Sequence, residues 1–395
     1  MQQHLPRDWR DALLLGRLLT QAGPTPILVR NGRVSDLSAL APTTAEFAAG
    51  WLQTWSSQPR LPGADLGELE SLALAPAWTT QRPAVPRLLS PLDLQCVKAS
   101  GVTFAVSAVE RVIEERARGD AARAQAVRDS LQSRVGTDIR SVKPGSPEAA
   151  RLKEALLADG LWSQYLEVAI GPDAEIFTKV PVLSSVGWGD WVGIRSDSAW
   201  NNPEPEVVLV CDPRGRPIGA ALGNDVNLRD LEGRSALLLG KAKDNNASCA
   251  VGPFVRLFDA RFTLDDVRGC EVGLEVAGED GFRLSGRSSM SLISRDPLEL
   301  IGQTSSRHHQ YPDGFALFLG TMFAPIEDRD VAGRGFTHKQ GDVVRVFSER
   351  LGSLENKVTT CEAAPPWTFG LSALMRNLAA RGLLGSGEST RKRVE

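Results

Sequence analysis

The pattern of hydrophobic and polar positions divides the chain into a mixed N-terminal part, a helical middle and a long part made of short strands. In the first part, helical patterns over residues 11–19 and 44–55 alternate with strand-like runs such as 27–30. A Pro-rich stretch over residues 76–91 is typical of a linker or a long surface connection. This arrangement predicts a small α/β unit over residues 1–92.

The middle of the chain shows helical periodicity. Between residues 102 and 135, Val106, Val109 and Ile113 share one face of an expected amphipathic helix, with charged residues on the other faces. A second helix is expected over residues 147–158. Its start and end are indicated by Ser146 as N-cap, Pro147 at the first helical position and Gly160 just past the last turn.

After residue 168 the pattern changes to short apolar runs separated by Gly, Pro, Asp and Asn, up to about residue 360. Such a pattern predicts a β-rich domain. Residues 366–384 then predict a terminal amphipathic helix, and the basic residues at 390–393 are expected to form a solvated charged tail. The predicted fold class is therefore α+β, with a β-rich domain over residues 93–395.

One predicted hairpin in this domain concentrates carboxylates. Glu204 and Glu206 are two residues apart, so on a strand they point to the same face. The run 207–210 continues that strand, turn residues follow at 212–215, and a returning strand brings Asp225 beside the two glutamates. Glu-x-Glu by itself is common on a solvated strand face. Three converging carboxylates repel one another unless a cation lies between them, and oxygen ligands indicate Mg²⁺, Mn²⁺ or Ca²⁺.

Composition and charge limit the classes of partner. The chain has 395 residues, is 42% hydrophobic and carries a net charge of −3, with basic and acidic residues interspersed, so no nucleic-acid partner is expected. No apolar run approaches about 18 residues, so neither a membrane span nor a secretion signal is expected. The five cysteines form no CxxC pair, which favours reduced thiols in a cytoplasmic protein.

The residues around the hairpin resemble successive signature blocks of the fumarylacetoacetate hydrolase superfamily. The matching blocks occur in the family's order and cover about residues 100–358; they are 203–207, 223–230, 242–243 running to Gly252-Pro253, 318–321, 341–344 and 351–358. Four further stretches resemble the sugar-acid dehydratase branch of that family, namely 98–104, 198–203, 240–246 and 311–314. The resemblance implies that residues 93–395 form a catalytic domain of that fold.

For the reaction, the resemblance implies a Mg²⁺-dependent hydro-lyase acting on 2-keto-3-deoxy pentonates such as the D-xylonate and L-arabinonate acids. It implies that Glu204, Glu206 and Asp225 bind the metal. Lys243 would place positive charge on the enolate formed from the substrate. Glu175, at the start of a strand resembling the family's, or alternatively Glu110, would be the base.

Two further positions are assigned by the resemblance. Arg229 and Thr321 are candidates for holding the substrate, although Arg229 could equally be an ion-pair partner of a neighbouring carboxylate. Ser107 stands where the family's hydrolases carry a catalytic histidine, and a serine is not a general base at neutral pH.

Ser107 therefore argues against the closest alternative, a hydrolase of acylpyruvates or other 2,4-diketo acids. An alternative of another class is a non-catalytic protein that binds a sugar acid or Ca²⁺. The expected partners are a small 2-keto sugar acid and further copies of the chain in a homodimer or homotetramer.

Overall fold

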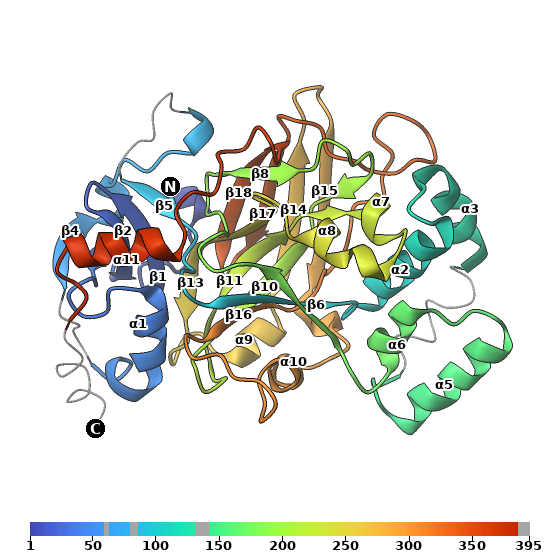
Figure 1. Cartoon of the computed structure of the whole chain (residues 1–395), viewed down its shortest axis with the longest axis horizontal. Helices are drawn as coiled ribbons and strands as arrows, with labels where there is room; N and C mark the ends of the chain where they lie inside the picture. Colours follow the sequence, from blue (N-terminus) through green and yellow to red (C-terminus); the bar gives the residue numbers. More distant parts are fainter. Residues whose placement is uncertain (59–62, 80–85, 132–141, 386–395) are drawn as a thin grey trace.

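Two β-sheets packed face to face form the centre of the structure, a computed structural model that describes residues 1–58, 63–79, 86–131 and 142–385 (Figure 1). The larger sheet has eleven strands in the order β4-β3-β2-β1-β13-β11-β10-β16-β6-β7, with β5 paired to β1. Its strands are β1 (Leu14–Thr20), β2 (Gly23–Arg30), β3 (Arg33–Asp36), β4 (Ala64–Glu68), β5 (Arg87–Leu89), β6 (Cys96–Gly101), β7 (Glu175–Val180), β10 (Pro205–Cys211), β11 (Pro217–Asp225), β13 (Cys249–Leu257) and β16 (Phe315–Phe318).

The smaller sheet has five strands in the order β15-β14-β17-β18-β8 and packs on one face of the larger sheet at β10, β11 and β13. Its strands are β8 (Trp191–Ile194), β14 (Glu271–Ala277), β15 (Arg283–Ser289), β17 (Val343–Ser348) and β18 (Gly352–Thr360). A two-residue pair, β9 (Asn201–Asn202) and β12 (Asn227–Leu228), lies beside the central hairpin.

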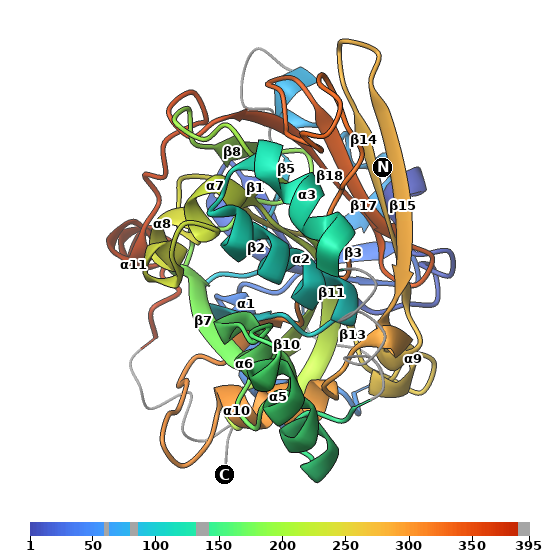
Figure 2. The ribbon, with the colours of Figure 1, turned by 90° about the vertical axis from the view of Figure 1, so that its right-hand side faces the viewer.

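The helices gather mainly at the two ends of the larger sheet (Figure 1). Figure 2 shows α2, α3, α5 and α6 at the end of the larger sheet where β7, its last strand, lies. At the other end, α1 and α11 lie against the first strands. The helices are α1 (Thr44–Gly50), α2 (Ala105–Ala117), α3 (Ala121–Leu131), α5 (Pro147–Ala158), α6 (Gln164–Ile170), α7 (Arg229–Glu232), α8 (Leu239–Lys243), α9 (Leu264–Arg268), α10 (Pro297–Thr304) and α11 (Leu371–Ala380).

Strand β10 is buried along its whole length because apolar layers cover both of its faces. Val207 and Leu209 point toward the smaller sheet and belong to the cluster that fills the space between the two sheets. Val208 and Val210 point to the opposite face, where Phe47 and Trp51 are part of a second cluster. A strand buried on both faces reads as a continuous apolar run, which explains the apolar residues 207–211 after Glu206 in β10.

Most predicted elements are confirmed. The α+β class is correct, residues 27–30 lie in β2, and the β-rich part begins with β7. The helix over residues 44–55 is confirmed as α1 followed by a π-helical turn, Trp51–Trp55. Helix α5 has the predicted bounds, and the hydroxyl of Ser146 accepts a hydrogen bond from the Ala149 amide at 3.2 Å.

Four predictions are wrong in part. Residues 14–20 form β1 instead of a helix, because they pair with β2, β5 and β13. The Pro-rich stretch contributes β5 to the sheet. The expected helix 102–135 is interrupted after α2, where Arg118 and Gly119 both adopt positive φ, and its last residues lie outside the described part. The terminal helix begins only at Leu371, after an extended segment, and the basic tail at 390–393 also lies outside the described residues.

The predicted domain boundary at residue 92 falls inside one continuous hydrogen-bonded sheet. Strand β1 pairs with β13, so Leu14 lies opposite Arg256, and the N-terminal strands extend the larger sheet. The division into two domains stays a prediction.

Candidate metal centre

The hairpin of β10 and β11 brings three carboxylates together at its end. The register places Glu206 opposite Gly223 and Pro205 opposite Asn224, and the Asp225 amide donates to the Glu204 carbonyl at 3.0 Å. Glu204, Glu206 and Asp225 are all at most 2% exposed, and each offers an oxygen within 4.8 Å of the others. The convergence of the three side chains therefore follows the predicted alternation along the two strands.

Two buried lysines lie against this carboxylate cluster. Lys243, at the end of α8, places Nζ 2.5 Å from Glu204 Oε2 and 3.2 Å from Asp225 Oδ2. Lys179, at the end of β7, places Nζ 2.7 Å from Asp225 Oδ1 and also donates to the Lys243 carbonyl. The three acids thus share the cluster with two cations in a region from which bulk water is excluded.

The cations are distributed unevenly over the carboxylates. Burial would raise the pKa of Glu204, but the Lys243 ammonium and the Arg111 guanidinium outweigh burial and hold it at about 2. Burial and the neighbouring charges of Asp225 and Glu204 instead raise the pKa of Glu206 well above its usual range. Burial would lower the pKa of Lys243, but Asp225 and Glu204 raise it, so Lys243 stays protonated at neutral pH.

The donor set fits a hard divalent cation. All three side chains offer carboxylate oxygens, the ligand type preferred by Mg²⁺ and Mn²⁺. Oδ1 of Asp225 is buried and makes no hydrogen bond among the described residues. Its contact with Lys179, at 2.7 Å, is an ion pair only. A cation at this point would also relieve the repulsion that raises the pKa of Glu206.

Helix α2 turns a polar stripe toward the carboxylate cluster. Ser107, Glu110, Arg111 and Glu114 follow the i, i+3, i+4, i+7 spacing of one helix face, and each is at most 8% exposed. Val106 is 43% exposed, so the predicted apolar face of Val106, Val109 and Ile113 is wrong at this position. The stripe is buried because its charges find partners on α7 and at the end of the hairpin.

Arg111 is the centre of this stripe. Its Nη2 lies 2.6 Å from Glu204 Oε1, and its Nη1 lies 2.7 Å from Glu114 Oε2 and 2.6 Å from Glu232 Oε2. One guanidinium therefore serves three buried carboxylates, which suits the planar fork of donors on arginine. Burial raises the pKa of Glu232 to about 7, although Arg111 opposes that change.

Arg229 and Glu110, two predicted site residues, contact each other. Arg229 Nη2 lies 3.0 Å from Glu110 Oε2, its Nε lies 2.6 Å from Glu114 Oε1, and its Nη1 donates to the Pro325 carbonyl at 3.2 Å. The guanidinium also lies 4.7 Å from the ring centre of Trp200. This geometry favours the ion-pair alternative for Arg229 and places Glu110 in the same buried network.

Ser107 and Thr321 connect α2 to Glu206. The Ser107 hydroxyl donates to the Thr321 carbonyl, and the Thr321 hydroxyl lies 3.2 Å from Glu206 Oε1. The Gly320 amide donates to Glu206 Oε2 at 2.7 Å. The short segment after β16 thus orients Glu206, and Ser107 holds that segment in place.

Glu175, the predicted base, begins β7 beside the cluster. It pairs with Gly101 of β6, and a Cβ at residue 101 would lie 1.8 Å from Glu175 Oε2, so only glycine leaves room for this carboxylate. The side chain is half-buried. Burial raises the pKa of Glu175, while the charges of Arg111 and Lys243 oppose that change. A carboxyl of raised pKa next to cations has the properties of a general base.

Sequence reasoning missed Lys179 and Arg111. A signal for Lys179 was available, because alternation along β7 places residues 175, 177 and 179 on one face. Arg111 directly follows Glu110 and looks like an ordinary surface charge on an amphipathic helix. Its role depends on Glu204 and Glu232, which lie about a hundred residues away in the sequence.

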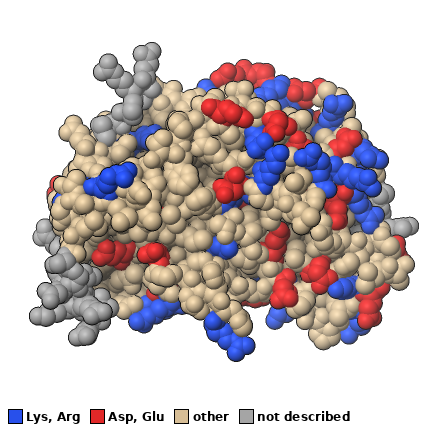
Figure 3. Space-filling model, viewed as in Figure 1, with Lys and Arg blue, Asp and Glu red and all other residues tan. Residues whose placement is uncertain are grey.

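Two global features bear on the expected partners. No described helix is long and apolar enough to cross a membrane. On the face drawn in Figure 3, basic and acidic side chains are intermixed over the part formed by α2 and α3, and the opposite part is mostly uncharged.

Comparison with known proteins places the chain in a family. No protein-family model matches the chain. It is 30% identical over 213 residues to a "Probable 2-keto-3-deoxyxylonate dehydratase" of Haloferax volcanii, covering 54% of this chain and 68% of that protein. It is 31% identical over 183 residues to the 2-dehydro-3-deoxy-D-arabinonate dehydratase of Saccharolobus solfataricus, covering 46% of this chain and 57% of that protein.

Solved structures share the fold over a larger part of the chain. A 2-keto-3-deoxy-D-arabinonate dehydratase complexed with magnesium and 2,5-dioxopentanoate matches 88% of this chain and 99% of its own, with a TM-score of 0.59 and 21% identity. A fumarylacetoacetate hydrolase of Exiguobacterium antarcticum matches the same shares of the two chains, with a TM-score of 0.53 and 17% identity. The chain therefore belongs to the family of the 2-keto-3-deoxy sugar-acid dehydratases, and it shares the fold of a fumarylacetoacetate hydrolase.

Proposed function

We propose that this protein is a Mg²⁺-dependent dehydratase that converts 2-keto-3-deoxy-D-xylonate, or the corresponding L-arabinonate acid, to 2,5-dioxopentanoate and water. The observation that carries the proposal is the buried cluster of Glu204, Glu206 and Asp225 beside the protonated Lys243. Both relatives with about 30% identity are named as dehydratases of such acids, which supports the choice of substrate.

Glu204, Glu206 and Asp225 would hold the cation. When bound, a divalent cation acts as a Lewis acid toward the carboxylate and keto oxygens of a 2-keto acid and makes the adjacent C3 proton more acidic. Arg111, Lys243 and Gly320 keep the carboxylates oriented through the contacts described above. Such orientation by outer partners is typical of metal sites in enzymes.

Glu175 would accept the proton from C3, because its carboxyl borders the cluster and burial raises its pKa toward the range useful for a base. Lys243 would stabilise the negative charge that develops on the substrate oxygens. The C4 hydroxyl then leaves, and the proton held by Glu175 can return to it to give water. Tautomerisation of the remaining unsaturated 2-keto acid yields 2,5-dioxopentanoate.

Ser107 supports elimination over hydrolysis. Its hydroxyl donates to the Thr321 carbonyl, so Ser107 would fix the segment around Thr321, and a serine is not a base that activates water at neutral pH. The Thr321 hydroxyl lies 3.2 Å from Glu206 Oε1 at the edge of the cluster, and Thr321 would contact the substrate from there.

The test is a product assay by NMR on the purified chain with 2-keto-3-deoxy-D-xylonate, in Mg²⁺ and in EDTA, with an acylpyruvate as a parallel substrate. We expect 2,5-dioxopentanoate only in the presence of the metal. Cleavage of the acylpyruvate alone would contradict the proposal and favour a hydrolase. Binding of the sugar acid without turnover would favour a binding protein.

We also infer a cytoplasmic homodimer or homotetramer. The five cysteines are all free, which is consistent with a reducing compartment. Light scattering on the purified protein would give the number of chains, and a monomer would contradict the inference.

A further inference from the structure

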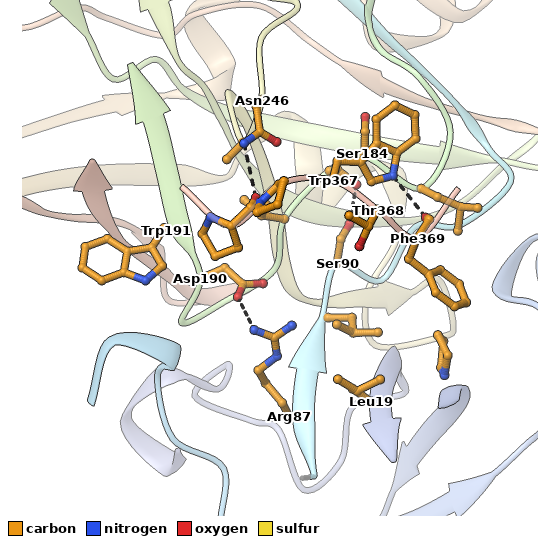
Figure 4. Close-up of a pocket in the computed structure, with 18 of the residues that line it drawn as sticks. Leu19, Arg87, Ser90, Ser184, Asp190, Trp191, Asn246, Trp367, Thr368 and Phe369 are labelled. Atoms are coloured by element: carbon orange, nitrogen blue, oxygen red, sulfur yellow. Dashed lines mark hydrogen bonds and ion pairs between the residues drawn. The ribbon is translucent and has the colours of Figure 1, made fainter. Parts of the chain in front are cut away.

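A cavity of about 380 Å³ lies outside the carboxylate cluster, beneath the segment that leads to α11. In Figure 4, Leu19 of β1 and Arg87 of β5 line it from below, and Trp367, Thr368 and Phe369 lie above. Residues 183–186 and 246–247 complete its wall. The volume falls in the range of sites that bind small molecules.

The walls of this cavity are mainly apolar. Leu19, Leu89 and Leu183 contribute aliphatic surface, and Trp367 and Phe369 contribute aromatic surface. The Trp367 indole donates a hydrogen bond to the Phe369 carbonyl at 3.1 Å, which fixes the ring although 47% of the side chain is exposed. Such walls favour a ligand with a compact apolar or aromatic body.

The charged residues of the cavity carry an excess of positive charge. Arg17, Arg87 and Asp190 are the charged side chains among its lining residues. Arg87 Nη1 lies 2.9 Å from Asp190 Oδ1, so these two charges largely balance. Arg17 is 6% exposed and donates to the carbonyls of Ser90 and Leu92, which carry no formal charge.

The carboxylate nearest to Arg17 is that of Asp93, which forms an ion pair with it but no direct hydrogen bond. Asp93 Oδ2 lies 3.9 Å from Arg17 Nε, beyond ordinary hydrogen-bond distance. The Asp93 carboxylate accepts hydrogen bonds from the amides of Thr44, Ala45 and Leu94, at 2.6, 3.0 and 2.7 Å. Asp93 balances the charge of Arg17 across this distance, but within the described part of the chain only Nη1 of Arg17 makes hydrogen bonds. Its Nε and Nη2 groups can therefore donate to an anionic group at the cavity wall.

We propose that this cavity is a second ligand site that binds a small monocarboxylate with an apolar or aromatic body. The carboxylate lies toward Arg17 and Arg87, and the body lies against the leucines and the aromatic residues of the covering segment. The site is separate from the carboxylate cluster, since the two share no residue.

One loop separates the cavity from Lys243. Asn246 and Ala247 line the cavity, and Asn246 Nδ2 donates to the carbonyls of Cys361 and Pro365 in the covering segment. The next residue, Ser248, donates its hydroxyl to the Lys243 carbonyl at 2.7 Å. A ligand in the cavity would thus touch the loop that fixes the backbone of Lys243.

The test is isothermal titration of the Mg²⁺-loaded protein with 3-phenylpropionate and with its uncharged isostere 3-phenylpropionamide. We expect saturable binding of the acid and binding of the amide weaker by about tenfold or more, the effect of losing one charge-assisted contact. Thr368→Trp, which fills the cavity from above, and Arg87→Gln should each weaken binding of the acid about tenfold or more. Arg214→Gln, at an exposed turn residue, is the matched control and should bind normally.

Three results would overturn the proposal. They are the absence of saturable binding, equal affinity for acid and amide, and full affinity in Thr368→Trp. The variant Glu206→Gln distinguishes this site from the metal centre. If Glu206→Gln lost binding of the acid and Thr368→Trp retained it, the acid would bind at the carboxylate cluster. Arg87→Gln leaves Asp190 unpaired and can disturb folding. Thr368→Trp changes a residue of the partly exposed segment 365–369, so it still tests the cavity in that case.

Discussion

At the scale of single residues, the environment of each carboxyl decides its role. Glu204, held by Lys243 and Arg111, has a pKa of about 2 and is ionised at neutral pH. At Glu175, burial outweighs the charges of Arg111 and Lys243 and raises the pKa. Pairs of acids whose surroundings move their pKa values in opposite directions are typical of active sites. The low pKa of Glu204 suits a metal ligand, and Glu206, whose pKa is raised by its neighbours, becomes a comparable ligand once a cation offsets their repulsion.

Replacing Glu175 by Gln should lower kcat by about 10²–10⁴-fold, since the variant keeps the shape of the side chain but cannot accept a proton. In the unmodified protein, kcat/KM should rise with pH through the raised pKa of Glu175, because the base works only when ionised. The acid limb of the profile should therefore lie above the ordinary carboxyl range and disappear in the variant.

Rates measured at saturating Mg²⁺ across pH would check this prediction. Glu271→Gln, at an exposed position of β14, is the control. Near-full turnover in Glu175→Gln would show that Glu175 is not the base. Glu110→Gln should mainly reduce stability, since Glu110 is paired with the buried Arg229.

At the scale of elements, α2 joins the end of the larger sheet to the carboxylate cluster through its polar stripe. Its first turn holds Thr321 through Ser107, and its second turn holds Glu204 through Arg111. The same helix packs against α3, α6 and α7. Any displacement of α2 would therefore change the positions of two candidate metal ligands at once.

Arg111→Met should strongly destabilise the protein, since it leaves Glu114, Glu204 and Glu232 buried around one missing cation. Breaking a buried ion pair from one side costs about 3–5 kcal/mol. Mg²⁺ should raise Tm more in this variant than in the unmodified protein, because the metal replaces part of the lost positive charge. Thermal unfolding with Mg²⁺ and with EDTA measures both effects.

Arg151→Met is the matched control, because the pair of Arg151 with Glu148 lies on the exposed face of α5. Its Tm should be unchanged. An equally stable Arg111→Met variant would contradict the role assigned to this guanidinium.

The sequence alone predicted the elements whose signals are local. The hairpin of β10 and β11 was predictable because strand alternation and turn residues lie within about twenty positions of one another. Strand β1 was not predictable, because the leucine-rich run around Leu14 fits a helix or a strand. Only its pairing with β13, a distant segment, makes it a strand. The inward face of α2 was also missed, since a charged stripe looks solvated until its distant partners are known.

At the scale of the whole molecule, the C-terminal segment ties the two ends of the chain together. Helix α11 lies on the first strands, where Asn377 Nδ2 donates to the Ala22 carbonyl and Arg381 Nη1 donates to the Pro24 carbonyl, both at 2.8 Å. Leu374 and Leu378 are each 4% exposed and face the sheet, whereas Leu371 is 51% exposed. The extended residues before α11 cover the cavity proposed above as a second ligand site (Figure 4).

Leu378→Ala should weaken the docking of α11 by about 2–4 kcal/mol, since it removes a buried leucine. Limited trypsin digestion should then cleave faster after Arg376 or Arg381, because the helix separates more often from the strands. Leu371→Ala is the control and should leave the digestion rate unchanged. Equal rates in the two variants would contradict the docking described for α11.

The parallel pairing of β6 with β16 has a consequence for the order in which the protein assembles. Residues 96–99 pair with residues 315–318, and the Gly320 amide that holds Glu206 lies 114 positions after it in the chain. The hairpin can close early, but its carboxylates obtain their full set of partners only when these distant segments meet, a slow step because of the large loop that must close. The interactions of the carboxylate cluster therefore form after the rate-limiting step of folding. They slow unfolding and do little to speed folding.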